Sequence, residues 1–403
     1  MTAKAGTVIV ADAELHTMLC VARALSARGV VVIAAGRRMA GAMLSRRPVQ
    51  RLVVEGDEEA YSKTVARVAL GKDAVAVFAH YENSMLGLGE SLRGTAARVI
   101  APPRGLLELA RSKHSVLDRA QRIGLRVPRT LPVRASDADA PGFEDRLRSE
   151  FGTRWPVFVK MDCEIGVDPG PGKRYMVLRG PTDLPALRGF ACGRGPLLVQ
   201  EYVEGRGCGI AGLFWRGEAV CVGGHVRLRE SHATGGVSTY CEARVVPAAW
   251  NAAIDLMRDL AWSGPAMVEF KLTRGGEAVL MEINPRFWGT LPLYVRAGLN
   301  IPFAAYEAFV LGRTRPDNRI REGLRMRFLR NDLLAIVTQS KGIRAAWEVG
   351  KVVATTPFFV FDPALEWSDP GPFLHQFLPA RVRGFVERWF PAASATREFP
   401  STM

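Results

Sequence analysis

The sequence lacks the features that mark membrane-spanning, disulfide-rich and zinc-binding proteins. Its longest apolar runs, such as Val30–Ala35, are far shorter than the roughly 18 residues that a membrane-spanning helix requires. The chain begins with a short polar lead, Met1–Gly6, which has no signal-peptide pattern. The six cysteines include no Cys-x-x-Cys pair and no histidine at zinc spacing, which predicts reduced, mostly packed thiols. We therefore expect a cytoplasmic protein.

Lysine is scarce as well. Only nine of the 54 basic residues are Lys, although the formal net charge is +14. The arginines are spread along the chain, without the basic block or the interleaved aromatic residues of a nucleic-acid recognition module. We interpret the charge as compositional bias with a preference for anionic ligands, and expect no specific nucleic-acid partner. With 403 residues, 48% of them hydrophobic, the chain is long enough for two or three packed globular units.

The first hundred residues alternate between short apolar strand patterns and amphipathic helix patterns. This alternation predicts a parallel sheet flanked by helices. No Gly-x-Gly-x-x-Gly follows the first strand pattern, so we predict a Rossmann-like domain that has no nucleotide of its own. Pro102 and Pro103 mark its end. The clearest segments are the strands 8–11, 30–34, 74–78 and 99–100 and the helix 15–28.

The most informative segment is 267–289, MVEFKLTRGGEAVLMEINPRFWG. It contains two strand patterns, 267–272 and 277–283, and the turn residues Arg-Gly-Gly at 274–276 separate them. Strand patterns joined by a short glycine-rich turn predict a two-stranded hairpin.

Three oxygen-bearing side chains are expected to meet on this hairpin. Because side chains on a strand alternate, Glu282 and Asn284 lie on one face, and the hairpin brings Glu269 back beside them. Two carboxylates and an amide oxygen form a hard site suited to Mg2+. Arg286 adds a permanent cation two residues later, and a metal beside an arginine is typical of phosphoryl transfer. A lone Glu-x-Asn, by contrast, is most simply a solvated strand end.

Two lysines stand in segments that precede the hairpin. Lys113 lies in a segment of helical character, 105–124, and Lys160 ends an apolar strand pattern, 155–160. Between them, Val-Pro-Arg-Thr at 127–130 opens a further strand. Taken singly, each lysine is most simply a surface charge, although a lysine is also a point cation suited to a phosphate group.

A glycine-rich segment, 166–174, follows the second lysine and resembles a P-loop only superficially. Five residues instead of four separate Gly166 from Gly172, and Arg174 stands where a P-loop has its metal-binding hydroxyl. A flap whose backbone N–H groups face a phosphate is the better interpretation. Acidic and thiol side chains at 162–164 make this flap unusual.

Two further strand patterns carry candidate ligand-binding side chains. Residues 197–205, LLVQEYVEG, form an apolar strand that ends in polar residues. Arg227 and Arg229 are two residues apart, which places them on one strand face, where a pair of arginines suits a carboxylate or an acyl phosphate. Two solvated edge arginines are the plainer alternative. His225 and His232 have no metal-ligand spacing with acidic partners, so we interpret both as structural or substrate-contacting residues.

The order of these segments resembles the ATP-grasp superfamily over about residues 100–315, in particular its carboxylate–amine ligases of the carbamoyl-phosphate-synthase and D-alanine–D-alanine ligase type. The resemblance implies an α/β protein of the α+β ATP-grasp kind, with a Rossmann-like pre-ATP-grasp domain at 1–104. A two-lobed ATP-grasp domain at 105–315 would follow, with a lid at about 128–198 and the nucleotide between its lobes. Residues 316–403, which begin at a proline boundary, are a C-terminal extension without an assigned role.

The same resemblance implies roles for individual residues. The lysines and the glycine flap would contact the phosphates of ATP, and the strand end at 200–204 would contact its adenine and ribose. Glu269, Glu282 and Asn284 would hold magnesium ions, for which Mn2+ could substitute. The residues expected to contact ATP are Lys113, Lys160, Gly170, Gly172, Gln200, Glu201, Tyr202, Val203 and Glu204.

The resemblance further implies an ATP-dependent ligase. Such an enzyme activates a carboxylate as an acyl phosphate and couples it to an amine or similar nucleophile, releasing ADP and phosphate. Arg286, with Arg227 or Arg229, would stabilise the charge that develops. The substrates are expected to be small and amino-acid-like, and the sequence nominates no base for the amine. Two alternatives stay open: an ATP-binding regulatory or scaffolding module without ligation, and a carboxylate kinase.

The C-terminal part carries one clear pattern. Apolar residues within 378–390 recur at helical spacing, and arginines occupy the rest of the helical wheel. We favour a helix that packs on the body of the protein itself. Contact of this segment with a membrane surface or a partner stays open, as does a homodimer.

Overall fold

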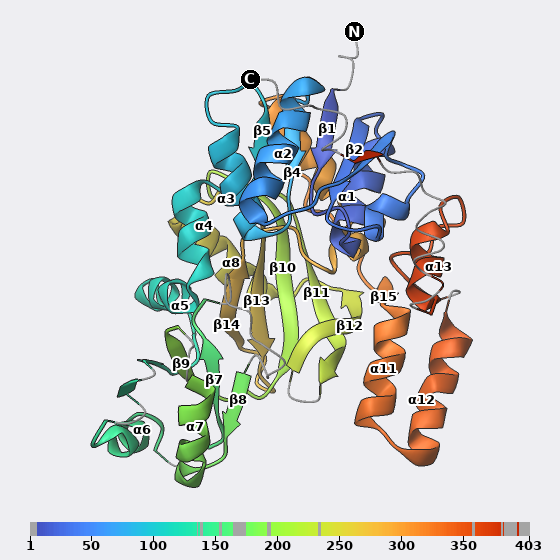
Figure 1. The fold of residues 1–403 in the computed structure, drawn as a ribbon. Coiled ribbons are helices and arrows are strands. Elements are labelled where there is room, and N and C mark those ends of the chain that lie inside the picture. Colours follow the sequence, from blue (N-terminus) through green and yellow to red (C-terminus); the bar gives the residue numbers. More distant parts are fainter. Residues whose placement is uncertain are drawn as a thin grey trace.

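The computed structural model of the chain contains three β-sheets. Figure 1 shows a parallel sheet at the top, a large sheet of long strands below it, and a small sheet at the lower left. No helix among the described residues is both long and apolar enough to cross a membrane. The described residues are 6–134, 136–137, 140–152, 155–163, 175–191, 195–232, 235–356, 359–379, 382 and 393–394.

The parallel sheet has the strand order β17-β3-β2-β1-β4-β5, and every pair in it is parallel. Its strands are apolar on both faces because helices cover both faces. In β1, Val8 and Val10 pack on the side of α1, while Ile9 packs on the opposite side with Tyr61 and Leu88 of α2 and α3. The predicted β/α alternation is confirmed. The bounds are β1 Thr7–Val10, α1 His16–Ser26, β2 Val31–Gly36, β3 Gln50–Val53, α2 Glu58–Gly71, β4 Ala76–Phe78, α3 Glu82–Ser91, β5 Arg98–Ile100 and β17 Ala393–Ser394.

The large sheet has seven strands in the order β14-β13-β10-β11-β12-β15-β16, antiparallel except for the last pair. Helix α8 packs on one face, and α9 and α10 share a core with α1 of the parallel sheet, so the two sheets form one packed body. The bounds are β10 Arg206–Trp215, β11 Glu218–His232, β12 Gly235–Ala243, α8 Pro247–Asp259, β13 Gly264–Leu272, β14 Ala278–Asn284, α9 Leu291–Arg296, α10 Ile301–Val310, β15 Arg325–Arg327 and β16 Val360–Phe361.

The small sheet has the order β6-β9-β7-β8 and a hydrophobic core of its own. Two helices, α4 and α5, lead to it. The single helical segment predicted at 105–124 is wrong in one respect: it is interrupted at Ser112, whose hydroxyl caps α5 by accepting a hydrogen bond from the Ser115 N–H. The bounds are α4 Arg104–Arg111, α5 Lys113–Arg122, β6 Thr130–Val133, α6 Phe143–Phe151, β7 Val157–Met161, β8 Tyr175–Leu178, α7 Leu184–Ala191 and β9 Leu197–Glu201.

The C-terminal part adds strands to both larger sheets. Strands β15 and β16 extend the seven-stranded sheet although they lie beyond residue 315, and β17 pairs with β3. Between them lie the helices α11 Leu329–Gln339, α12 Gly342–Thr355 and α13 Gly371–Phe377. Most of the helix predicted at 378–390 lies outside the described residues. The predicted domain boundaries stay predictions.

Most of the described cysteines are packed inside the protein. The five described cysteines are free, and all but Cys163 are buried. Burial raises the pKa of Cys20, Cys208, Cys221 and Cys241 to about 12, so these thiols stay protonated and unreactive at neutral pH.

Candidate functional site

The predicted hairpin of β13 and β14 is present, and its register aligns the acidic side chains. Glu269 lies directly opposite Glu282, and Met267 lies opposite Asn284. The Asn284 amide donates a hydrogen bond from Nδ2 to Glu282 Oε1 over 3.2 Å and accepts one at Oδ1 from Arg286 Nη2 over 3.1 Å. The structure therefore brings these four predicted side chains together in one cluster.

Both predicted lysines lie near this cluster. Lys113 is the first residue of α5, and its Nζ is 3.7 Å from Glu282 Oε2. Lys160 Nζ donates a hydrogen bond to Gln200 Oε1 over 2.9 Å. Burial lowers the pKa of Lys160, and the Lys113 charge lowers it further, while Glu282 opposes the shift.

One carboxylate fixes the position of Lys113 relative to the small sheet. Asp162, next to the end of β7, accepts hydrogen bonds from Ser112 Oγ over 2.9 Å and from the His114 N–H over 2.8 Å. The Lys113 N–H donates to the Asp162 carbonyl over 3.3 Å. The acidic residue that made the flap unusual in the sequence thus anchors the beginning of α5, where an anion is favoured by the helix dipole.

The two facing glutamates differ in charge environment. Burial raises the pKa of Glu269, and the Glu282 charge raises it further against the opposing effect of Arg227. Burial also acts to raise the pKa of Glu282, but Lys113 and Lys160 outweigh it, so this pKa is lowered. Two partly buried carboxylates that face each other form a place where a divalent cation would be stabilised. No cluster of three His, Cys, Asp or Glu residues suited to a metal occurs in the part of the chain described, and the predicted set relies on an amide as its third ligand.

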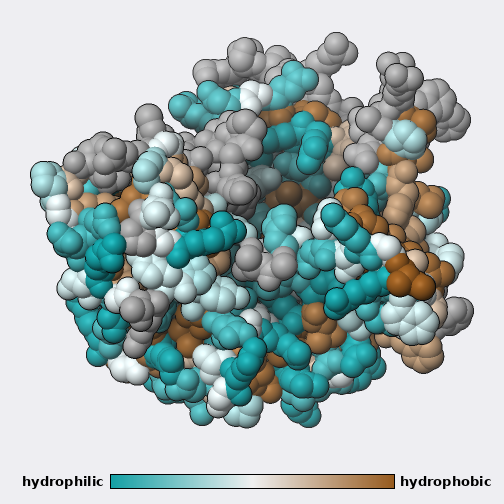
Figure 2. Space-filling view, turned by 90° about the horizontal axis from the view of Figure 1, so that it is seen from below, coloured by the Kyte–Doolittle hydropathy of each residue, from teal (hydrophilic) through white to brown (hydrophobic). Residues whose placement is uncertain are grey.

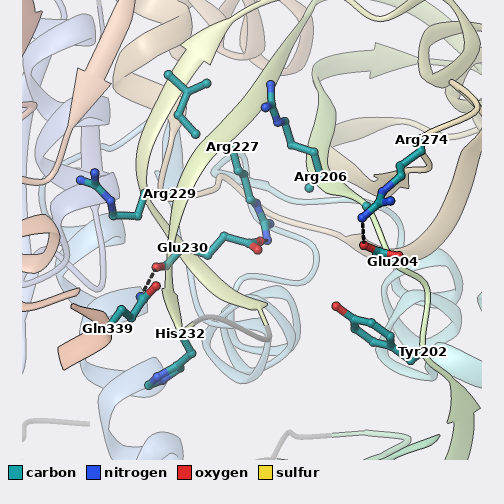
Figure 3. A pocket seen from close by; sticks show the side chains of 12 residues that line it. Tyr202, Glu204, Arg206, Arg227, Arg229, Glu230, His232, Arg274 and Gln339 are labelled. Atoms are coloured by element: carbon teal, nitrogen blue, oxygen red, sulfur yellow. Dashed lines mark hydrogen bonds and ion pairs between the residues drawn. The ribbon is translucent and has the colours of Figure 1, made fainter. Parts of the chain in front are cut away.

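The prediction that Arg227 and Arg229 share a strand face is wrong. The pairing of β11 with β12 shifts register between these two residues, which is a β-bulge, and Figure 3 shows the two side chains leaving β11 in opposite directions. Arg227 is buried and forms ion pairs with Glu269 and Glu230. Arg229 instead holds Asp332 at 2.8 Å and Glu348 at 2.9 Å, on α11 and α12.

The strand end at 200–204 forms a connected polar and aromatic segment. Gln200 is buried and donates from Nε2 to Thr130 Oγ1 over 3.1 Å, so it links Lys160 to β6. Glu201 accepts a hydrogen bond from the Arg129 N–H over 2.9 Å. The Tyr202 ring stacks on Phe158 with centroids 5.3 Å apart. Two other predicted contacts, Gly170 and Gly172, lie outside the described residues.

A cavity of about 500 Å3 lies between this strand end and β11 (Figure 3). Arg227 connects the cavity to the acidic pair because it lines the cavity and binds Glu269. The described lining includes neither of the two lysines nor Glu282, so the cavity covers only one side of the cluster. The lining residues are Tyr202, Glu204, Gly205, Arg206, Gly207, Arg227, Leu228, Arg229, Glu230, His232, Arg274 and Gln339.

Sequence reasoning missed several charged residues of this region. Lys271 is two residues from Glu269, and its Nζ is 3.5 Å from Glu230 Oε2, so the period-two argument would have found it. Glu82 belongs to α3, a helix that covers the parallel sheet, and no spacing pattern in the sequence links it to the β13–β14 hairpin. Its Oε1 is 4.0 Å from Arg286 Nε, and its Oε2 is 3.9 Å from Arg111 Nε.

Glu82 and His80 lie near Arg286, and each has a polar atom that could still form a hydrogen bond. Glu82 Oε2 and His80 Nδ1 are buried, and neither has a hydrogen-bond partner among the described residues. Burial raises the pKa of Glu82 in spite of Arg286, whereas burial and the Arg286 charge lower the pKa of His80. A carboxyl group and a neutral imidazole therefore lie next to the predicted arginine.

Comparisons with known proteins agree with this architecture. Residues 194–331 match a family described as ATP-grasp in the biosynthetic pathway with Ter operon. No curated protein matches the chain. Among solved structures, the biotin carboxylase domain of 2-oxoglutarate carboxylase from Hydrogenobacter thermophilus, a complex with MgADP, ADP and bicarbonate, is 17% identical. The match covers 79% of this chain and 73% of that one, with a TM-score of 0.62.

Two further structures are similar at 15% identity each. The biotin carboxylase of Campylobacter jejuni, in a β-γ-ATP complex, has a TM-score of 0.64 over 79% of this chain and 74% of that one. N5-carboxyaminoimidazole ribonucleotide synthetase, in an ADP complex, has a TM-score of 0.59 over 79% of this chain and 81% of that one. These likenesses show that the chain has the fold of these structures, and residues 194–331 match an ATP-grasp family within it.

Proposed function

We propose that the protein is an ATP-dependent ligase that activates a carboxylate as an acyl phosphate and couples it to an amine or similar nucleophile. One observation carries the proposal: Glu269 and Glu282 face each other across β13 and β14, with Lys113 and Arg286 beside them. Facing carboxylates bordered by cations are suited to a metal-bound polyphosphate. The ATP and ADP complexes among the similar structures support a nucleotide at this site.

Glu269, Glu282 and Asn284 would hold Mg2+. Two carboxylates and an amide oxygen match its preference for hard oxygen ligands, and when bound it would withdraw negative charge from the phosphate oxygens. Glu269 would exchange part of its interaction with Arg227 for the cation, which would free the Arg227 guanidinium for an anionic substrate. The raised pKa of Glu269 fits a carboxylate that lacks enough positive charge in the free protein.

The two lysines would bind and align the phosphates of ATP. Lys160 is well placed for this because its ammonium group is already partly buried and hydrogen-bonded, so less water has to be removed when an anion arrives. Gln200 holds the Lys160 ammonium from one side and is itself held by Thr130, which restricts the lysine to one position.

Arg286 would stabilise the negative charge that develops during phosphoryl and acyl transfer. Its guanidinium is held by the Asn284 amide oxygen and by the Phe287 carbonyl, and it lies beside Glu82. The substrate carboxylate would attack the γ-phosphorus, which forms the acyl phosphate and releases ADP. Arg286 and Arg227 would stabilise the oxygens that carry the developing charge.

The amine must then lose a proton, and Glu82 is our candidate for accepting it. The amine nitrogen would attack the carbonyl carbon, the C–O bond to phosphate would break, and the N–H proton would pass to the Glu82 carboxylate. Glu82 Oε2 and His80 Nδ1, which have no hydrogen-bond partner among the described residues, can each accept a hydrogen bond from an amine, which favours this nucleophile over an acidic one.

The proposal is tested by ADP release. Purified protein with MgATP is offered the twenty amino acids singly and in pairs, and the products are weighed by mass spectrometry. We expect ADP release with at least one combination and its loss in the double variant Glu282→Gln with Asn284→Ala. Glu277→Gln is the matched control, because Glu277 belongs to the same hairpin but is paired with Arg126 at the surface.

The outcomes separate the alternatives. ADP release that is equal in wild type and double variant would refute the assignment of the metal ligands. A phosphorylated carboxylate without a coupled product would identify a carboxylate kinase. Binding of MgATP without ADP release under any of these conditions would favour a binding module.

A further inference from the structure

The helices α11 and α12 form a hairpin at the edge of the large sheet and leave much apolar surface uncovered. Val352 is the one buried residue of α12, and α11 buries three residues, Asp332, Ala335 and Ile336. Figure 1 shows the hairpin projecting at the lower right, and Figure 2 shows hydrophobic surface on that same side of the molecule. The exposed apolar side chains are Leu334 (49%), Val337 (54%), Ile343 (91%), Trp347 (69%) and Val353 (69%). We call these five residues the hairpin patch.

The hairpin patch follows from the way the two helices pack. On α12, the less exposed residues 345, 348, 349 and 352 face the protein, so Ile343 and Trp347, four residues apart, lie on the outer side. On α11, Leu334 and Val337 are three residues apart and exposed. Several exposed apolar side chains gathered on one helix pair indicate a surface that another molecule covers.

The charges around the hairpin patch are of one sign. The exposed charged residues of 329–355 are Arg330, Lys341, Arg344 and Lys351. The two acidic residues of this segment face Arg229: Asp332 pairs with it, and Glu348 pairs with both Arg229 and Lys351. The outer surface of the hairpin therefore combines aliphatic and tryptophan side chains with the positive charges of Arg330, Lys341 and Arg344.

We propose that the hairpin patch docks on an anionic lipid surface. A helix pair that exposes apolar residues, a tryptophan and an excess of basic charge is suited to the interface of a membrane that carries negative headgroups. A second copy of the chain fits less well, because a two-fold contact would bring the same basic residues of both copies together. This inference is independent of the proposed ligase function.

Docking of the hairpin patch on a membrane would also hold the cavity between the 200–204 strand end and β11 near the bilayer. Gln339, at the end of α11, lines the cavity and donates a hydrogen bond from Nε2 to the Glu230 carbonyl over 2.9 Å. Arg229 ties α11 and α12 to β11 through its two carboxylate partners. The hairpin is thus joined to the wall of the cavity, and a surface that orients the hairpin orients the cavity as well.

Flotation of the full chain with lipid vesicles tests the proposal. We expect the protein to float with vesicles of phosphatidylglycerol and phosphatidylcholine in about 0.1 M salt, and to remain in solution with vesicles of phosphatidylcholine alone. Raising the salt to roughly 1 M, where the Debye length falls to about 3 Å, should release most of the bound protein.

Two double variants identify the surface. Ile343→Ser with Trp347→Ser should lower the vesicle partition coefficient at least about tenfold, because it removes the two largest exposed groups of the hairpin patch. Lys341→Gln with Arg344→Gln should lower it about 25-fold, or about fivefold for each basic residue. All four positions are exposed, so the variants should remain folded.

The matched control removes the same kind of side chain elsewhere. Val49 (69% exposed) and Trp367 (84% exposed) lie outside the hairpin, and Val49→Ser with Trp367→Ser should change partition less than about twofold. The proposal is overturned if wild type does not float with anionic vesicles, or if the control loses as much binding as the hairpin variant. A concentration-dependent dimer in sedimentation that Ile343→Ser with Trp347→Ser abolishes, without vesicle binding, would assign the hairpin patch to a second copy of the chain.

Discussion

Replacing Lys160 with Met should weaken MgATP binding by between about tenfold and 150-fold, or roughly 1.5 to 3 kcal/mol. Methionine keeps the length of the side chain, so the change removes the charge with little loss of packing. Opposite charges 4 Å apart attract by about 4 kcal/mol at an effective dielectric constant of about 20. The expected loss is smaller because Lys113 stays within 3.7 Å of Glu282 and keeps part of the positive potential.

The same substitution should change stability much less than binding. It leaves Gln200 Oε1 without its donor, which costs about 1 to 3 kcal/mol for a buried acceptor. It also removes a buried cation whose pKa is lowered by that burial, which offsets part of the cost. Lys160→Met should therefore lower MgATP affinity more than the free energy of unfolding. Denaturant unfolding measures the second quantity separately.

Isothermal titration calorimetry with MgATP measures the predicted loss. Lys63→Met is the control, because Lys63 is 65% exposed and pairs with Glu59 on α2, and we expect it to change affinity less than about twofold. In wild type, affinity should fall as the pH rises towards the lowered pKa of Lys160, and this part of the pH dependence should be absent from the variant. A folded Lys160→Met protein with wild-type affinity would remove Lys160 from the nucleotide site.

Four further predictions concern the acidic cluster, its neighbours and a buried histidine. Glu282→Gln with Asn284→Ala should abolish ADP release while the far-ultraviolet circular dichroism spectrum stays unchanged. Arg286→Lys should lower turnover about 100-fold with MgATP affinity nearly preserved, and equal losses in both would make it a ground-state contact. Glu82→Gln should lower coupling to an amine about 100-fold but leave acyl phosphate formation, trapped as a hydroxamate with hydroxylamine, near wild type. Burial lowers the pKa of His225 to about 3, below the 6.5 of the unfolded chain, so unfolding takes up a proton between these values and stability falls as the pH drops. Denaturant titrations should show about 1.7 kcal/mol lost from pH 6.5 to pH 5, and His225→Gln should remove that component.

The β13–β14 hairpin could be predicted from the sequence because both of its signals, strand alternation and a glycine-rich turn, are local. Alternation along a strand puts Glu282 and Asn284 on one face, and the Arg-Gly-Gly turn brings Glu269 opposite Glu282. Buried strands such as β1 and β9 are short apolar runs that end at polar residues, so their existence and approximate bounds are also local properties. Short strands are different: β15 has three residues and β16 two, which is too few for a periodic pattern.

The positions of Arg227 and Arg229 show where prediction from strand alternation fails. Alternation along β11 would place Arg227 and Arg229 together, but pairing with β12 inserts a bulge between them. The bulge turns Arg227 towards Glu269 and leaves Arg229 to bind Asp332 and Glu348, about a hundred residues later in the chain. A bulge depends on the partner strand and on what each side chain meets, so it cannot be inferred from the strand alone.

Glu82 differs from the other charged residues of the site because no local sequence pattern predicts its place there. The glutamates, the lysines and Arg286 lie within segments that carry a recognisable pattern, and their proposed partner, the triphosphate of ATP, is common to many enzymes. Glu82 reaches the site only because α1, α9 and α10 share one core and hold the parallel sheet against the large sheet. The residues that touch the variable substrate should therefore come from the ends of the parallel strands, as Glu82 and His80 do, since ligands of such sheets bind beyond the carboxyl ends of their strands. By this argument, substitutions at the β4–α3 connection should change which amine is coupled, whereas substitutions on β13 and β14 should change whether ATP is used at all.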